Sequence, residues 1–305
     1  MRKIGIIGLG HIGRLLAHQL VMTGMADQLV LIDQYDDLAL AVQTDLFAAS
    51  TAFNSSTKLL LQDYDALHDA DILVTAFGNS RVLRENPMGE LIENGATIKK
   101  IAPLIKNSGF HGIVINLSDP NEAITAFLQE QLAMPPKQVL GLGTTIDTAQ
   151  MRLAVANAAQ LSSENVSGFV YGQHNGQVVV AWSTVTVNGQ PLTESINGHH
   201  LDSYQLEITA KQDNWYTMHG LGYSASAPVM WTIKIISAIQ KDANLAVPLA
   251  FFQPQYSTYL GFPVLVNSKG QGNPLLLNLY PVERERIKNA ANTISQQLKI
   301  LREKG

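Results

Sequence analysis

Short apolar runs alternate with stretches of helical hydrophobic spacing along the first 144 residues of the chain. Apolar runs of this length predict strands, and apolar residues spaced three or four apart predict helices that bury one face. Strands that alternate with helices predict a parallel sheet with right-handed crossovers. The predicted strands cover residues 3–7, 28–32, 59–61, 70–77, 113–117 and 139–142, and the main predicted helices start after residue 10 and cover 38–49, 90–108 and 123–132.

The pattern changes after residue 144. A helix is predicted over 145–160, followed by antiparallel strands over 166–172 and 178–187 and the turn Asn188-Gly189. Helices are predicted next over 192–213 and 225–242. The chain then forms a predicted hairpin of strands 262–266 and 275–279, joined by residues 269–272, and ends in a predicted helix over 282–302. We therefore expect an α/β fold. A Rossmann-type doubly wound parallel sheet, residues 1–144, precedes an α+β substrate domain with antiparallel hairpins, residues 145–305.

The first predicted strand ends in the sequence Gly8-Leu9-Gly10-His11-Ile12-Gly13, and a helical stretch follows directly. This is the G-x-G-x-x-G pattern of a dinucleotide-binding turn, and Asp33 lies at the distance where an acid accepts hydrogen bonds from the adenosine ribose. Gln34-Tyr35-Asp36 supplies no cation for a 2′-phosphate, so NAD is favoured over NADP. The strand over 70–77 should end beside the same crevice. The residues expected to hold NAD are Gly8, Gly10, His11, Ile12, Gly13, Asp33, Phe77, Gly78 and Asn79.

Composition narrows the class of protein. The net charge of −4 and the absence of a basic tract argue against a nucleic-acid or anionic-membrane partner. No apolar run is long enough to span a bilayer, and a strand that begins at residue 3 leaves no room for a signal peptide, so we expect a cytoplasmic protein. The absence of cysteine excludes disulfides, thiolate metal sites and a cysteine nucleophile, and we expect no metal site.

Reduction of a ketone by a nicotinamide cofactor requires a proton donor at the carbonyl oxygen, and histidine suits this role. A carboxylate on the second ring nitrogen fixes the tautomer and stabilises the imidazolium. His174, in a turn between two predicted strands, and Asp147, in the first turn of a predicted helix, are the candidates. With eight histidines and 25 acidic residues in the chain, a surface histidine near a solvated acid remains the alternative.

The chain resembles the L-lactate and L-malate dehydrogenase superfamily over nearly its whole length, and within it is most similar to the L-2-hydroxyisocaproate dehydrogenases. The resemblance implies that His174 is the acid/base and Asp147 its partner. It also implies a loop arginine over the site, for which Arg84 is the better-placed candidate and Arg81 the other, and a homo-oligomer, either a dimer or a tetramer. The matching segments are residues 8–33, 70–79, 108–112, 118–120, 141–149, 166–174 and 180–185, and the C-terminal hairpin and helix.

Several positions depart from the family pattern. Gln150 replaces the arginine that binds the substrate carboxylate in the family, and an amide brings no charge to that role. Asp119 replaces an asparagine that donates to the substrate oxygen, whereas an ionised carboxylate can only accept. Arg152 matches a second family arginine and is interpreted as structural. Ser224 matches a threonine on the wall of the substrate site, and Pro228 matches an apolar residue beside the nicotinamide.

Three hypotheses follow. The first is an NAD-dependent oxidoreductase that acts on an L-2-hydroxy acid with an apolar side chain, or on a related hydroxy compound, with His174 carrying the proton. The second keeps the enzyme but gives it a neutral or amine-bearing ketone, because Gln150 and Asp119 change the charge of the site. The third is a diverged relative that binds the dinucleotide with little catalysis.

Overall fold

The computed structural model describes residues 2–52, 55–79, 88–192, 195–196 and 198–304. Its first half contains β1 (Lys3–Ile7), α1 (His11–Met22), β2 (Gln28–Ile32), α2 (Asp36–Ser50), β3 (Lys58–Leu61), β4 (Ile72–Thr75), α4 (Gly89–Asn107), β5 (Ile113–Asn116), α5 (Asn121–Leu132), β6 (Val139–Gly141) and α6 (Thr145–Ala158). Its second half contains β7 (Val166–Ser167), β8 (Val170–Gly172), β9 (Val178–Val180), β10 (Thr186–Val187), β11 (Gln190–Pro191), β12 (Ser195–Ile196), β13 (His199–His200), α7 (Ser203–Leu221), α8 (Ser226–Gln240), β14 (Leu245–Gln253), β15 (Thr258–Asn267), β16 (Gly270–Pro274) and α9 (Pro281–Lys304).

The main sheet has 11 strands in the described part of the chain. Six parallel strands come first, in the order β3-β2-β1-β4-β5-β6, and the strand order reverses at β1, where β4 is its second neighbour. The sheet continues with antiparallel strands β14, β15, β8 and β9, and β16 pairs with β15. The predicted α/β class, with a doubly wound parallel sheet followed by antiparallel hairpins, is confirmed.

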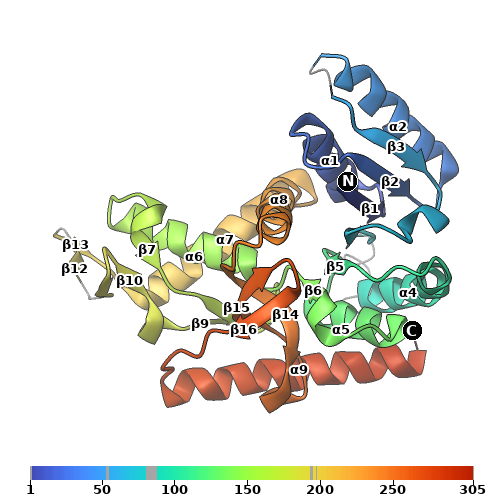
Figure 1. The fold of residues 1–305 in the computed structure, drawn as a ribbon. Coiled ribbons are helices and arrows are strands. Elements are labelled where there is room, and N and C mark those ends of the chain that lie inside the picture. The colour runs from blue at the N-terminus through green and yellow to red at the C-terminus, as the bar shows by residue number, and fades with distance from the viewer. Residues whose placement is uncertain (1, 53–54, 80–87, 193–194, 197, 305) are drawn as a thin grey trace.

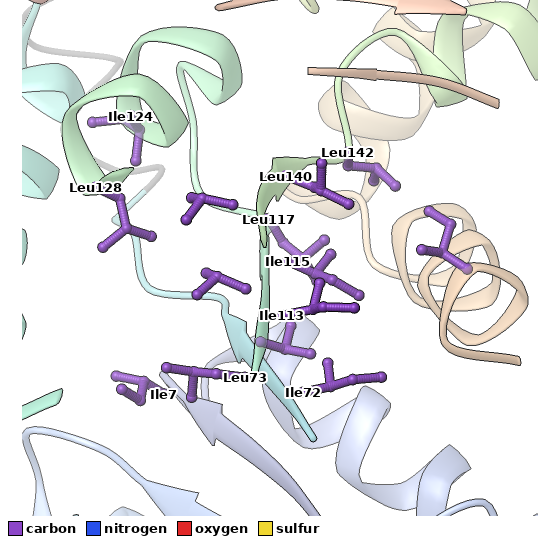
Figure 2. Close-up of a cluster of buried hydrophobic side chains, with 14 of the residues drawn as sticks. Ile7, Ile72, Leu73, Ile113, Ile115, Leu117, Ile124, Leu128, Leu140 and Leu142 are labelled. Carbon is purple, nitrogen blue, oxygen red and sulfur yellow. The ribbon is translucent and has the colours of Figure 1, made fainter. Parts of the chain in front are cut away.

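The core lies on both faces of this sheet. All four residues of β5 are buried, as expected for a parallel strand that helices cover on both sides. Figure 2 shows apolar side chains of β4, β5 and β6 packed together with Ile124 and Leu128 of α5. The long helix α9 runs along α4 and α5, while α8 packs against α1 (Figure 1). No helix among the described residues is both long and apolar enough to cross a membrane.

The predicted strands over 166–172 and 178–187 are each interrupted. Gly168, with φ of +123°, separates β7 from β8, and a 3₁₀ helix over Trp182–Thr184 separates β9 from β10. As a result, β8 and β9 join the main sheet, while β7 and β10 pair in a small separate sheet. The predicted turn at Asn188 and Gly189 is confirmed, since both residues are left-handed, with φ of 51° and 77°.

The predicted helix over 192–213 was placed too early. A short antiparallel pair, β12 and β13, precedes it, and α7 begins at Ser203. The carboxylate of Asp202 accepts a hydrogen bond from the backbone N–H of Tyr204 at 2.9 Å and so satisfies a free donor at the helix start.

The predicted hairpin of strands 262–266 and 275–279 has its first strand within β15, but its second strand was placed too late in the sequence. The main partner of β15 is β14, a nine-residue strand that the sequence analysis did not predict. The other neighbour, β16, ends at Pro274, so residues 275–279 lie outside the strand. β14 contains Pro248, and a proline within an apolar run argues against a strand because it lacks the N–H that a ladder needs. Pro248 lies opposite Pro263, so both prolines share one rung of the ladder.

Candidate active site

The segments that follow β1, β4, β5 and β6 meet at one edge of the sheet, because parallel strands place their carboxyl ends on the same side. Gly8, with φ of +97°, packs so closely on the turn after β4 that a Cβ there would lie 2.7 Å from the backbone of Ala76 and Phe77. A Cβ on Gly13 would lie 1.8 Å from the carbonyl oxygen of Gly8. At Gly10, by contrast, a Cβ would meet no atom within 4 Å. Two of the three glycines therefore allow close packing, and the third leaves backbone open to an approaching group.

Asp33 lies at the end of β2, beside this turn. Its Oδ2 accepts the backbone N–H of Leu9 at 2.7 Å, and its Oδ1 accepts the backbone N–H of Tyr35 at 3.0 Å. Each carboxylate oxygen has a second lone pair, so the group can still accept two hydroxyl donors. These contacts hold the Asp33 carboxylate beside the glycine-rich turn.

Two cavities adjoin at the glycine-rich turn. The larger cavity, of about 410 Å³, is lined by Gly8, Asp33 and Asn79 among others. The smaller cavity, of about 180 Å³, is lined by Ile12 and His174 among others. The residues that line both are Gly10, Ala76, Phe77 and Gly78. The structure thus brings together the residues expected to hold NAD, with Gly13 beneath them. An open backbone at Gly10, a fixed acid at Asp33 and two adjoining cavities fit an extended dinucleotide.

His11 connects the two halves of the molecule. Its ring stacks on Tyr223, just before α8, with centroids 3.8 Å apart and planes 2° from parallel. Its Nδ1 lies 2.6 Å from Nη2 of Arg14. Both rings line the smaller cavity. The sequence analysis expected His11 at the cofactor but did not identify Tyr223, whose local signal was an aromatic residue in the Gly222-Tyr223-Ser224 turn.

His174 follows β8, in a turn where Asn175 adopts the left-handed conformation with φ of 55°. Its Nδ1 lies 2.7 Å from Oδ2 of Asp147, in the first turn of α6. Burial alone lowers the pKa of His174, but the charge and hydrogen bond of Asp147, with Asp119 and Glu122, outweigh it and raise the pKa to about 10. Because Nδ1 is engaged by Asp147, Nε2 is the nitrogen that can exchange a proton in the cavity.

Three further carboxyl groups surround this pair. Glu122, in the first turn of α5, is fully buried, and its Oε1 accepts the backbone N–H of His174 at 3.1 Å. Burial raises the pKa of Glu122 to about 8. Burial also raises the pKa of Asp119, and burial with the nearby charges of Asp119 and Glu93 raises the pKa of Glu90 to about 7. The sequence analysis missed Glu90 and Glu122; the available signal was that each lies in the first turn of a helix beside a predicted site segment.

The remaining predicted site residues are distributed as follows. Asp119, Ser224 and Pro228 line the His174 cavity. Gln150 does not; it lines two neighbouring cavities of about 640 and 210 Å³, the first of which shares His11, Ile146, Tyr223 and Ser224 with the His174 cavity. Arg81 and Arg84, the loop candidates, lie outside the described residues.

Arg152 is not directed at the cavity. Its guanidinium donates to the carbonyl oxygen of Gly168 through Nε at 3.2 Å and Nη2 at 2.9 Å, and it lies over the ring of Phe169, 5.2 Å from the centroid. These contacts hold the irregular backbone between β7 and β8, two strands that lead into the His174 turn.

Comparison with known proteins identifies the family. Residues 2–141 match the sequence model of the lactate/malate dehydrogenase NAD-binding domain. An L-lactate dehydrogenase from Lactobacillus delbrueckii subsp. bulgaricus is 31% identical over 304 residues, covering 97% of this chain and 98% of the relative. L-lactate dehydrogenase 1 of Listeria innocua is 28% identical, with 97% and 96% covered.

Solved structures agree on the fold. MGS-M5, a lactate dehydrogenase from a Medee basin deep-sea metagenome library, superposes with a TM-score of 0.92 at 23% identity and covers 99% of both chains. The ligand-bound minor L-lactate dehydrogenase of Enterococcus mundtii gives 0.91 at 24% identity, with 98% of both chains covered. This chain therefore belongs to the lactate/malate dehydrogenase family and is an oxidoreductase that acts on CH–OH groups with NAD as its cofactor.

Proposed function

We propose that this protein interconverts an L-2-hydroxy compound and the matching 2-oxo compound, with His174 as the acid/base and Asp147 as its partner. The observation that carries the proposal is the 2.7 Å contact between His174 Nδ1 and Asp147 Oδ2, in a histidine that lines the cavity next to Gly10. The contact leaves Nε2 to serve the substrate, and a carboxylate on the other nitrogen stabilises the charged ring.

In the oxidation direction, NAD held at the glycine-rich turn would supply the acceptor for the hydride of the carbinol carbon. The hydroxyl proton passes to Nε2 of His174, and the C–O single bond becomes a carbonyl. The imidazolium that forms is stabilised by Asp147. In the reduction direction His174 must begin protonated, and its raised pKa of about 10 keeps it so at neutral pH. We assign Gly8, Gly10, Gly13 and Asp33 to holding the cofactor.

L-2-hydroxy acids with an apolar side chain are the first substrate class we propose. Two observations support it: relatives across the full length are named L-lactate dehydrogenases, and the cavity wall includes Leu117, Leu142 and Ile146. The sequence likeness to L-2-hydroxyisocaproate dehydrogenases favours branched side chains within this class. In this proposal Asp119 and Ser224 contact the substrate, Gln150 contacts it from the adjoining cavity that shares Ser224, and Arg84 polarises the carbonyl.

A second substrate class is favoured by the charge of the site. Gln150 brings no positive charge, and Asp119 and Glu90 line the His174 cavity as carboxyl groups. A hydroxy compound that is neutral or bears an amine avoids the repulsion that a substrate carboxylate would meet there.

The test of the proposed function is NADH oxidation by the purified protein with straight and branched 2-oxo acids and matched neutral ketones, beside His174→Ala and Gln150→Arg. We expect turnover that falls by about 10² or more in His174→Ala. Activity towards 2-oxo acids that appears in Gln150→Arg but not in the wild type would show that the site has lost the charged partner of the substrate carboxylate. Equal turnover in the wild type and His174→Ala would refute the assigned proton transfer.

We also propose a homo-oligomer. Leu40 and Phe47 of α2, Leu153 of α6 and Leu221 of α7 are large apolar side chains that are exposed in the single chain. Leu153 and Leu221 line one cavity together, and exposed apolar side chains that lie together are typical of interfaces. Sedimentation of the purified protein decides between monomer, dimer and tetramer. A cytoplasmic location stays a prediction.

A further inference from the structure

We infer that the substrate carries an ammonium group on the carbon next to the reacting carbinol, where related hydroxy acids carry a carboxylate. The inference rests on the proposed dehydrogenase chemistry and selects the amine-bearing member of the second substrate class. The observation that carries it is that Asp119 and Glu90 line the same cavity as His174.

The charged groups of this wall set the sign of the ligand charge. Among the described residues that line the His174 cavity, Asp119 and Glu90 are the acids, His11 and His174 are the only basic side chains, and none is a lysine or an arginine. The His174 imidazolium is already offset by Asp147, which lies 2.7 Å away. Within the described lining, the two other carboxyls thus decide the balance. A ligand cation would allow both to ionise, whereas a ligand anion would oppose them.

The carboxyl groups lie close to where chemistry occurs. Asp119 lines the same cavity as His174, the histidine of the proton-transfer pair. Glu90 reaches the cofactor side of the cavity, since its Oε1 would lie 3.2 Å from a Cβ on Gly78. A cation held between these two groups therefore lies beside the carbon that gives up its hydride.

A second, independent feature points to a polar ligand in the same place. Ser118 lines this cavity, is 3% exposed, and its Oγ finds no hydrogen-bond partner in the described part of the chain. A buried hydroxyl without a partner is costly, and a ligand N–H group would satisfy it. An ammonium has three donors, which matches one hydroxyl and two carboxyls.

The position of Gln150 argues in the same direction. The residue that replaces the family arginine lines the two neighbouring cavities and not the His174 cavity. Its amide is uncharged and so offers no ion pair to a substrate carboxylate. Relative to the family pattern, the described site has thus lost its anion partner at Gln150 and gained one acid, Asp119.

The test uses three alcohols with the same three-carbon skeleton: L-lactate, (S)-propane-1,2-diol and (S)-1-amino-2-propanol, which bear a carboxylate, a hydroxymethyl and an aminomethyl group. Each alcohol is added to the complex of the protein with NADH. Because the alcohol and NADH are both in their reduced forms, no turnover occurs, and binding is followed by NADH fluorescence. We expect the amino alcohol to bind at least about tenfold more tightly than either of the others. Lactate or the diol binding as tightly as the amino alcohol, or no binding of the amino alcohol, would overturn the inference.

Variants locate the effect. Asp119→Asn should remove most of the preference for the amino alcohol, and Glu90→Gln should reduce it. Glu285→Gln, on the exposed side of α9, removes the same charge elsewhere and should leave the ratio of the three dissociation constants unchanged. A preference that survives both Asp119→Asn and Glu90→Gln would refute the role assigned to these carboxyls.

NADH oxidation by the matching ketones (pyruvate, hydroxyacetone and aminoacetone) separates the two proposals. Selective binding of the amino alcohol without reduction of any ketone would refute the dehydrogenase proposal and leave the binding site. Reduction of pyruvate together with tighter binding of lactate would confirm the dehydrogenase and overturn the ammonium site.

Discussion

The carboxyl of Glu122 accepts a hydrogen bond from the backbone N–H of His174 at 3.1 Å, although 52 residues separate the two in the chain. The first turn of α5 therefore holds the turn that carries the imidazole. The second oxygen of Glu122 is buried without a hydrogen-bond partner among the described residues. A carboxyl in this setting is more stable protonated than ionised, so its protonation is linked to folding.

Glu122→Gln should change how stability depends on pH. Burial raises the pKa of Glu122 to about 8 in the folded protein, while the unfolded carboxyl titrates near its ordinary 4.5. The folded state binds this proton more tightly, so the wild type loses stability as pH rises from the unfolded pKa through the folded one. Glutamine keeps an acceptor for His174 and does not ionise. We expect the free energy of unfolding of Glu122→Gln, relative to the wild type, to rise by roughly a few kcal/mol between about pH 5 and pH 9.

Chemical denaturation at both pH values measures this difference. Glu122→Leu is the matched control, because it removes the acceptor as well as the charge and should destabilise the protein at both pH values. A difference between Glu122→Gln and the wild type that does not vary with pH would show that Glu122 does not titrate in this range.

Asp147→Asn should move the pH dependence of ketone reduction. In the proposed mechanism ketone reduction uses protonated His174, so its rate in the wild type should fall only as pH rises through the His174 pKa of about 10. Asparagine removes the charge that opposes the effect of burial, so the pKa of His174 drops and the rate should already fall near neutral pH. We also expect kcat at pH 8 to decrease by about 10² to 10⁴.

Measurement of kcat/KM for ketone reduction from acid to alkaline pH tests this. Glu122→Gln provides the comparison, because it leaves the Asp147 contact intact and should retain most of the alkaline limb. An unchanged alkaline limb in Asp147→Asn would mean that another group supplies the proton.

Gly10 should be needed for the cofactor and not for folding. A Cβ at this position meets no protein atom within 4 Å, so Gly10→Val should leave the thermal unfolding midpoint nearly unchanged. The same side chain would stand where a dinucleotide approaches, and we expect the NADH dissociation constant to rise about tenfold or more. Gly220, in α7, is an equally open control. Gly220→Ala should leave NADH binding unchanged, since it adds a methyl group away from the cavities.

Gly13→Ala gives the opposite pattern. Its Cβ would lie 1.8 Å from the carbonyl oxygen of Gly8, so the first helix cannot pack on the sheet without moving. We expect a loss of several kcal/mol in unfolding free energy, larger than for either open glycine. Equal stability of Gly10→Val and Gly13→Ala would contradict the distinct roles of the two glycines.

The first half of the fold was predictable because its signals are local. The turn from Gly8 to Gly13, the strand before it and Asp33 after it all lie within one supersecondary unit, and their spacing alone predicts their roles. Buried parallel strands are continuous apolar runs, which remain visible in a single sequence. The second half depends on pairing between strands that lie far apart in the sequence, and several of the strand and helix boundaries predicted there were wrong.

Two features show why local patterns were insufficient. Pro248 argues against a strand when the sequence is read alone, yet in the sheet it lies opposite Pro263, so the missing donors fall on the same rung. Glu122 reads as an ordinary charge at a helix start, and only the tertiary fold buries it against His174. The pairing of Asp147 with His174 had many competitors in the sequence and was singled out by family resemblance.

Arg152 offers a test of whether a family arginine has a structural role in this chain. Its guanidinium donates twice to the carbonyl oxygen of Gly168 and lies over Phe169, so Arg152→Met should leave that carbonyl without its donors. We expect a loss of about 1–3 kcal/mol in unfolding free energy, with KM for the substrate changed less than twofold. Arg152→Lys is the informative comparison, because lysine keeps the charge but cannot reproduce the forked donation. If the contact is structural, lysine should recover only part of the stability. Urea denaturation and steady-state kinetics on the same preparations test this, and a large rise in KM with unchanged stability would instead place Arg152 in substrate binding.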